Sequence, residues 1–117
     1  MASDRMRRVD ESMRVVLSEA ISTDIKDPRV GFVTVTGVRT SPDLRQARVY
    51  VSVLGDAEQR AGSLDGLQSA HGFLQRRVAS SLRLKHTPTL IFEYDDTVDR
   101  AMHITQLIEG EANVDRD

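Results

Sequence analysis

The chain has 117 residues, of which 39% are hydrophobic and 29% are charged, and it contains no cysteine. This composition is typical of a single folded domain, and the lack of cysteine excludes disulfides, thiolate metal sites and cysteine nucleophiles. No apolar run approaches the roughly 20 residues of a membrane span, and the amino end lacks the apolar core of a signal peptide. We therefore expect a cytoplasmic protein that does not bind a membrane.

The charge is unevenly distributed, although the net charge is only −2. Residues 1–90 carry 14 Lys and Arg against 10 Asp and Glu, whereas residues 91–117 carry 2 against 8. The body of the chain is thus basic and its carboxy-terminal end acidic. Such asymmetry suits a domain with one face that contacts phosphate, and the alternative is charge scattered over a solvated surface.

The spacing of apolar residues in the first half of the chain predicts one helix followed by two strands. Residues 4–25 place apolar side chains at helical spacing, and Asp27-Pro28 ends this helix because the residue before proline avoids the helical region. Residues 32–38 and 47–53 are rich in β-branched side chains and flank a Ser-Pro-Asp turn. This pattern predicts an antiparallel hairpin.

The sequence of residues 55–94 predicts a loop, a helix and a strand. Residues 55–63 are polar and contain glycine, which indicates a loop, and residues 64–84 then show the period of a helix. Thr87-Pro88 ends that helix, and residues 90–94 are rich in strand-forming side chains.

A short helix and an acidic tail complete the predicted elements. Residues 98–108 show helical spacing, and the acidic residues before them suit a helix cap better than a site for a hard cation. We expect one domain over residues 1–110 and a flexible acidic tail over residues 111–117. The predicted fold is α+β, with a three-stranded sheet and helices on one face.

The stretch LQSAHGFLQRR, residues 67–77, has a glycine in the middle of a predicted helix. Glycine there costs about 1 kcal/mol relative to alanine, and an unbroken helix would turn Phe73 away from the apolar stripe of Leu67 and Leu74. A bend at Gly72 would return Phe73 to the core and expose backbone at the break. The bend then serves either packing alone or packing and ligand binding.

The segment from Ala70 to Pro88 contains no Asp or Glu. On an ideal helix Gly72, Arg76 and Arg83 fall within about 40° of one another, opposite the apolar stripe. Exposed backbone N–H groups and arginine side chains are donors that bind phosphate, whereas the alternative is that the arginines only keep an outer face soluble. The candidate RNA-binding residues of this segment are Ala70, His71, Gly72, Arg76, Arg77, Arg83 and Lys85.

Other basic residues could extend this surface. Arg7 and Arg14 share a side of the first helix, and Arg45 and Arg48 lie at the hairpin. On the first helix, however, acidic residues are interspersed among the arginines, and this favours a mixed solvated face over a binding stripe.

The motifs of catalysis and cofactor binding are absent from the sequence. It has no G-x-S-x-G or S-x-x-K motif, no H-E-x-x-H spacing, no P-loop and no dinucleotide fingerprint. We therefore expect no catalytic residue, no metal site, no cofactor and no small-molecule substrate.

Three segments in order resemble the ribosome-binding factor A family of bacterial small-subunit assembly factors. They are DPRVGFVTVTGVRTSPDLRQARVYVSV at residues 27–53, AHG at residues 70–72 and RLKHTPTLIFEYDD at residues 83–96. The similarity extends from about residue 4 to residue 109. The resemblance implies a type II KH-like fold, in which an Ala-x-Gly kink at residues 70–72 replaces the usual G-x-x-G loop.

The resemblance also implies a function without catalysis. Members of the family bind the free small ribosomal subunit, contact its ribosomal RNA, assist late maturation including processing of the 5′ region, and support growth in the cold. We expect this chain to act in that way as a monomer. The alternative is a protein-protein interaction module that uses the sheet or the acidic region of residues 93–111 and does not contact RNA.

Overall fold

The computed structural model describes residues 4–115, with only the backbone described for residue 98 and residues 109–115. The helices and strands follow one another in the order α1 (Asp4–Asp24), β1 (Val33–Thr40), β2 (Gln46–Val53), α2 (Ala57–Ser69), α3 (His71–Leu82), β3 (Thr89–Tyr94) and α4 (Thr97–Asp115). The first helix, the hairpin and the third strand lie where the sequence predicts them.

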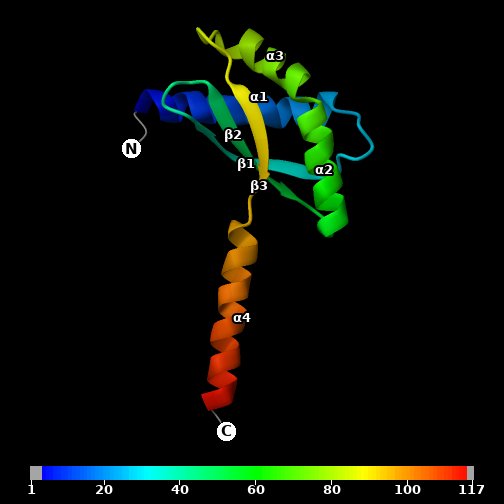
Figure 1. The fold of residues 1–117 in the computed structure, drawn as a ribbon, viewed down its shortest axis with the longest axis vertical. Coiled ribbons are helices and arrows are strands. Elements are labelled where there is room, and N and C mark those ends of the chain that lie inside the picture. Colours follow the sequence, from blue (N-terminus) through cyan, green and yellow to red (C-terminus); the bar gives the residue numbers. More distant parts are fainter. Residues whose placement is uncertain (1–3, 116–117) are drawn as a thin grey trace.

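The strands form one mixed sheet in the order β1-β2-β3 (Figure 1). β1 and β2 are antiparallel, with Val33 opposite Val53 and Thr40 opposite Ala47, which confirms the predicted hairpin. β2 and β3 are parallel, so the chain must cross back between them, and α2 and α3 make this crossing. The register shifts between Val35 and Gly37, which places a bulge in the edge strand β1.

One face of the sheet carries the core, and the other is open. In β2 the buried side chains alternate with Arg48, Tyr50 and Ser52, as the period of a half-buried strand requires. Helices α1, α2 and α3 supply the other side of the core, as predicted. The buried apolar residues are Met13, Leu17, Ala20, Ile21, Val35, Ala47, Val49, Val51, Val53, Leu67, Leu74, Val78, Leu90 and Phe92.

The predicted connection over residues 55–63 is wrong, because α2 begins at Ala57. Asp56 and Gln59 form a capping box: the Asp56 carboxylate accepts from the Gln59 N–H at 2.8 Å, and the Gln59 side chain accepts from the Asp56 N–H at 2.8 Å. The small residues that suggested a loop are packing residues instead. Ser63 Oγ accepts from the Gly31 N–H at 3.2 Å, and a Cβ on Gly62 would lie 3.7 Å from the Arg29 carbonyl oxygen.

The predicted bend lies at Ala70 and not at Gly72. Ala70 ends α2, with its N–H donating to the carbonyl oxygens of Gly66 and Leu67, and its own carbonyl accepts from the Leu74 N–H at 3.0 Å to start α3. The break has the expected consequence for Phe73, which packs against the core as a partly buried residue. Helix α3 ends at Leu82, two residues before the predicted end at residue 84, because Arg83 adopts a left-handed conformation with φ 49°.

Helix α4 projects from the body (Figure 1), and none of its described side chains belongs to the core. It is longer than the predicted short helix, since it continues to Asp115. The flexible tail over residues 111–117 stays a prediction, and residues 116–117 lie outside the described residues. The expected cap is present: Asp95 Oδ1 accepts from the Thr97 N–H at 3.0 Å. None of the described helices has the length and apolar character needed to cross a membrane.

Candidate nucleic-acid interface

The junction of α2 and α3 presents the amino end of α3 to solvent. Among the described residues no side chain caps this end, so the first turn of α3 keeps the unpaired N–H groups and the positive end of the helix dipole. His71 is exposed, and its Nδ1 donates to the Gln68 carbonyl oxygen at 2.8 Å. This arrangement offers donors to an anion at residues 71–73.

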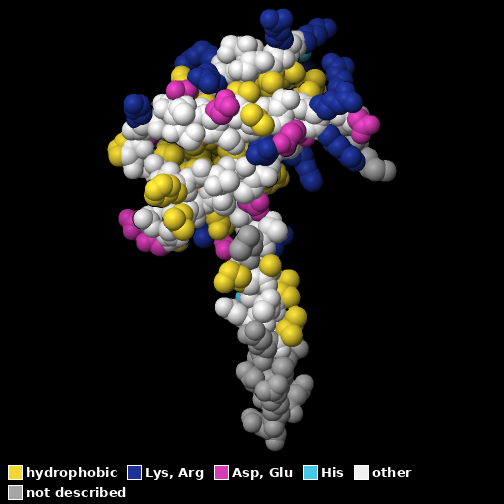
Figure 2. All heavy atoms as spheres, turned by 180° about the vertical axis from the view of Figure 1, so that it is seen from behind, with side chains coloured by type: hydrophobic (Ala, Val, Ile, Leu, Met, Phe, Trp, Pro, Cys, Tyr) yellow, Lys and Arg dark blue, Asp and Glu magenta, His cyan; other side chains and the backbone are white. Residues whose placement is uncertain are grey.

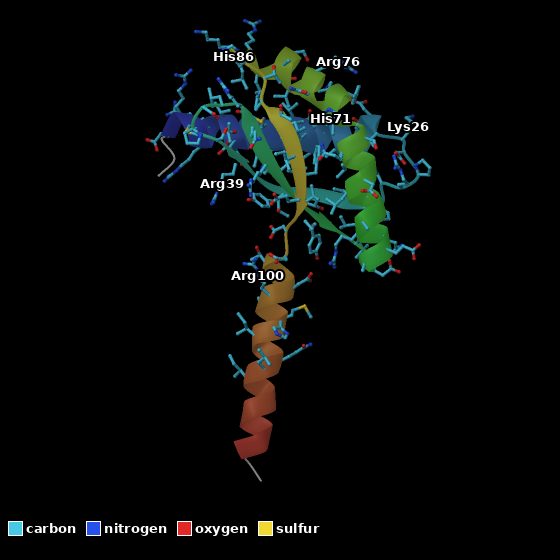
Figure 3. All side chains as sticks on the ribbon, in the orientation of Figure 1. Lys26, Arg39, His71, Arg76, His86 and Arg100 are labelled. Atoms are coloured by element: carbon cyan, nitrogen blue, oxygen red, sulfur yellow. The ribbon has the colours of Figure 1, made fainter. Side chains whose placement is uncertain are left out.

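Gly72 lies in the first turn of α3, beneath the side chain of Arg76. A Cβ at Gly72 would lie 3.7 Å from Arg76 Nη1, so the guanidinium folds back along α3 towards its amino end. The glycine has no positive φ and is not needed for the turn itself. The guanidinium of Arg76 and the amino end of α3 therefore face the same region, as Figure 3 shows for Arg76 and His71.

Three cations of the predicted segment are exposed and have no acidic partner among the side chains that the structure describes. They are Arg76 on α3, Arg83 at its end and Lys85 in the following connection. Because Arg83 lies beyond α3 in the left-handed conformation, it does not share a helix face with Gly72 and Arg76 as the ideal helix predicts. Figure 2 shows Lys and Arg side chains gathered on the part of the body away from α4.

Arg77, the fourth predicted cation, is bound within the protein. Its Nη1 lies 2.6 Å from Asp24 Oδ2, and its side chain is only 39% exposed. The pair joins α3 to the end of α1, two elements that pack against each other. The geometry therefore gives Arg77 a role in holding the two helices together, and a phosphate would have to compete with Asp24 for it.

Three of the four other predicted arginines also have acidic neighbours. Arg14 Nε donates to Glu11 at 3.0 Å, Arg48 lies 3.4 Å from Glu93, and Arg45 lies 3.9 Å from Asp43. The Glu11 side chain, by its hydrogen bond, raises the pKa of Arg14 above its ordinary value. These exposed pairs are weak, so they do not prevent binding, but they lower the net positive charge around each arginine.

A groove of about 820 Å³ runs between α1 and β1. Arg7, Arg14 and Arg39 line it together with acidic residues of α1. Asp10, on its floor, accepts from the Thr40 N–H at 3.0 Å and so fixes α1 to the end of β1. The groove thus brings Arg7 and Arg14 together on one surface, as their spacing predicts.

Arg39 is the basic residue that the sequence reasoning missed. It is exposed (Figure 3) and has no acidic partner among the described side chains. In the strand pairing it lies directly opposite Arg48 of β2. Two like charges at opposite positions of a strand pair repel each other, and a bound anion would relieve this repulsion. Strand alternation alone could not have found it, because Arg39 has the same parity as the buried Val35, and only the bulge between Val35 and Gly37 turns Arg39 to the open face.

The arrangement supports binding chemistry. Arginine and lysine side chains with an uncapped helix end suit phosphate groups, which accept hydrogen bonds and carry negative charge. No group of three or more His, Asp or Glu placed to hold a metal ion is found among the described residues.

Comparison with known proteins identifies relatives along nearly the whole chain. A family model described as ribosome-binding factor A matches residues 5–108. The chain is 44% identical over 110 residues to ribosome-binding factor A of Desulfitobacterium hafniense, which covers 94% of this chain and 88% of the relative. It is 38% identical over 109 residues to ribosome-binding factor A of Natranaerobius thermophilus, which covers 93% and 83%.

Solved structures agree with these relatives. The crystal structure of ribosome-binding factor A from Thermus thermophilus has a TM-score of 0.68 at 29% identity and covers 76% of this chain and 94% of that chain. The solution structure of a Thermotoga maritima protein has a TM-score of 0.71 at 35% identity, with coverages of 80% and 89%. The fold is therefore the type II KH-like fold expected from the resemblance, and the chain belongs to the ribosome-binding factor A family.

Proposed function

We propose that this protein binds the free small ribosomal subunit through its ribosomal RNA and assists the late maturation of that subunit. We include in this role the processing of the 5′ region of the small-subunit RNA and support of growth in the cold. The protein acts in the cytoplasm as a monomer, without a cofactor. A related Thermus thermophilus factor, 30% identical with a TM-score of 0.62, has been fitted into a cryo-EM map of its complex with the 30S subunit, which supports the choice of partner.

The observation that carries the RNA contact is the Arg76 guanidinium folded back over Gly72 at the uncapped amino end of α3. A phosphate at this position accepts hydrogen bonds from backbone N–H groups and from the Arg76 guanidinium, and the positive end of the helix dipole attracts it. Arg83 and Lys85 continue the positive surface beyond α3, and Arg7 and Arg39 continue it along the groove of α1 and β1. Recognition then depends on phosphate and shape more than on base stacking, since only 4% of the residues are aromatic.

Reversal of one charge tests this assignment. Arg76→Glu should weaken co-sedimentation with purified free small subunits at least tenfold, because a repulsive carboxylate replaces a phosphate-binding fork. Arg100→Glu is the matched control, since Arg100 is an exposed arginine at the base of α4, away from α3 (Figure 3). It should bind protein-free small-subunit RNA as the parent protein does, whereas Arg76→Glu should bind this RNA less well, and both variants should keep the parent's circular dichroism spectrum.

Free ribosomal RNA separates this function from the alternative. RNA added in excess should compete with the subunits for the parent protein. Binding that is indifferent to RNA competitor and to Arg76→Glu would instead favour a protein-binding module without RNA contact. The processing role is tested in cells that lack the protein: 5′-extended precursor RNA should accumulate, and the parent but not Arg76→Glu should remove it.

A further inference from the structure

Helix α4 carries large apolar side chains that nothing in the described structure covers. Met102 is 58% exposed, Ile104 57%, Leu107 55% and Ile108 60%. Ala101, Ile104 and Ile108 follow one another at spacings of three and four residues, so they form one stripe along the helix. Figure 2 shows these hydrophobic side chains along the part of α4 that stands clear of the body. A surface of this kind marks an interaction site in a soluble protein.

The base of α4 is fixed to the body by two carboxylates. Asp95 accepts from the Thr97 N–H at 3.0 Å and, through its other oxygen, from the Thr36 hydroxyl of β1 at 2.7 Å. The Tyr94 hydroxyl donates to Asp99 of α4 at 2.8 Å. The apolar stripe is therefore presented in a set direction, which lowers the entropy lost when a partner binds it.

Arg60 completes this junction. Its guanidinium lies 3.8 Å from the centre of the Tyr94 ring and 3.6 Å from Asp99 Oδ2. It thus holds both partners of the Tyr94–Asp99 hydrogen bond and ties α2 to the first turn of α4. The hydrogen bond to Asp99 in turn raises the pKa of Tyr94 and keeps the hydroxyl a donor.

Charge decides which partner fits the stripe. Residues 91–117 carry 8 Asp and Glu against 2 Lys and Arg. Phosphate groups of RNA would be repelled by this segment, and a second copy of α4 would bring the same excess of negative charge. A basic protein with an apolar patch would be attracted, and proteins that sit on ribosomal RNA are basic because they neutralise its phosphates.

We propose that the apolar stripe of α4 docks on a basic protein of the small ribosomal subunit while the α3 side of the body contacts ribosomal RNA. This inference rests on the proposed function, because it takes the subunit as the partner. The protein then bridges RNA and protein components with two oppositely charged ends. Helix α4 sets which assembly state is recognised, since its site exists only after the basic protein has joined the subunit.

Paired variants of α4 test the docking. Ile104→Glu should weaken binding to purified small subunits at least tenfold and leave binding to protein-free small-subunit RNA unchanged. Gln106→Glu is the matched control, because it adds the same charge about 160° around the helix. Ile104→Leu keeps the stripe apolar and should bind as the parent does. None of these residues belongs to the core, so the thermal unfolding midpoint should stay constant.

A photoreactive amino acid in place of Ile108, an exposed member of the stripe, identifies what lies against the stripe. We expect a crosslink to a basic protein of purified small subunits. A crosslink to RNA or to a second copy, the absence of any crosslink, or equal loss of binding for Ile104→Glu and Gln106→Glu would overturn the docking proposal. A parent protein that fails to bind subunits at all would overturn the proposed function and this inference with it, whereas a parent that binds and an unaffected Ile104→Glu variant would overturn this inference alone.

Discussion

Two glycines of α2 and α3 have opposite structural roles. A Cβ on Gly66 would lie 2.6 Å from Val30 Cγ2, a short side chain that is itself partly buried against the core. Gly66→Ala should therefore lower the free energy of unfolding by about 1–3 kcal/mol through overpacking. At Gly72 a Cβ would meet only the end of the Arg76 side chain at 3.7 Å, so Gly72→Ala should raise the same free energy by up to about 1 kcal/mol. Urea unfolding of both variants measures these changes.

The binding of Gly72→Ala separates the two roles considered for the bend. If residues 70–72 contact phosphate, the new methyl group stands beside the Arg76 guanidinium and hinders the approach of the phosphate, so the variant should bind subunits less well although it is more stable. Unchanged affinity would show that Gly72 is not part of the contact. A loss of stability comparable to that of Gly66→Ala would contradict the geometry of α3.

Neighbouring arginines show what sequence alone could not distinguish. Arg76 and Arg77 have the same side chain, and the sequence predicts both as RNA-binding residues of the basic segment. Only the packing of α3 on α1 brings Asp24 to Arg77 and leaves Arg76 without an acidic partner in the described chain. The pair is separated by 53 residues in sequence, so no local pattern announces it. The general location of the site could be predicted, but its ion-paired members could not.

At the level of elements, periodicity predicted the helices and strands that bury a regular face. It placed the start of α2 too late because Gly62 and Ser63 resemble loop residues, and the reason for their small size is contact with the Asp27–Gly31 loop. The capping box of Asp56 and Gln59 was readable in the sequence as a helix start. Periodicity did not give the position of the break at Ala70, since alanine is a strong helix former, whereas the family resemblance implied a kink at residues 70–72.

At the junction of β3 and α4, Asp95 makes a contribution to the free energy of unfolding that depends on pH. Hydrogen bonds from Thr97, and next from Thr36, hold the pKa of Asp95 below its ordinary value of 3.8. A lowered pKa in the folded state means that the carboxylate stabilises the fold above the ordinary pKa, and that this contribution is lost as pH falls through the folded pKa. Asp95→Asn should therefore unfold at a lower temperature than the parent at pH 7.

Thermal unfolding from pH 7 down to about pH 2 checks the sign of this effect. The difference in unfolding temperature between the parent and Asp95→Asn should shrink as Asp95 becomes protonated. Asp96→Asn is the matched control, because Asp96 pairs with Arg100 on the surface and does not bridge to β1. A difference for Asp95→Asn that stays constant over the whole range would show that its carboxylate charge does not stabilise the junction.

The whole molecule is elongated because α4 leaves the body. The radius of gyration is 17.3 Å, whereas a compact domain of this length has about 13 Å. Basic side chains gather on the part of the body away from α4 (Figure 2), and the acidic segment of residues 91–117 includes most of β3 and α4 (Figure 1). A near-neutral net charge therefore conceals two ends of opposite sign, in agreement with the charge counts of residues 1–90 and 91–117.

Salt dependence tests how many cations of the body meet phosphate. Five exposed cations have no acidic partner among the described side chains: Arg76, Arg83, Lys85, Arg7 and Arg39. If about five phosphates are neutralised, the logarithm of the association constant for small-subunit RNA should fall against the logarithm of salt concentration with a slope of about −3.5 to −4.5. Arg76→Gln with Arg83→Gln should make this slope shallower by about 1.4–1.8. Arg100→Gln removes the same kind of charge at the base of α4 and should leave the slope unchanged, so equal slopes for all three proteins would place the RNA elsewhere on the molecule.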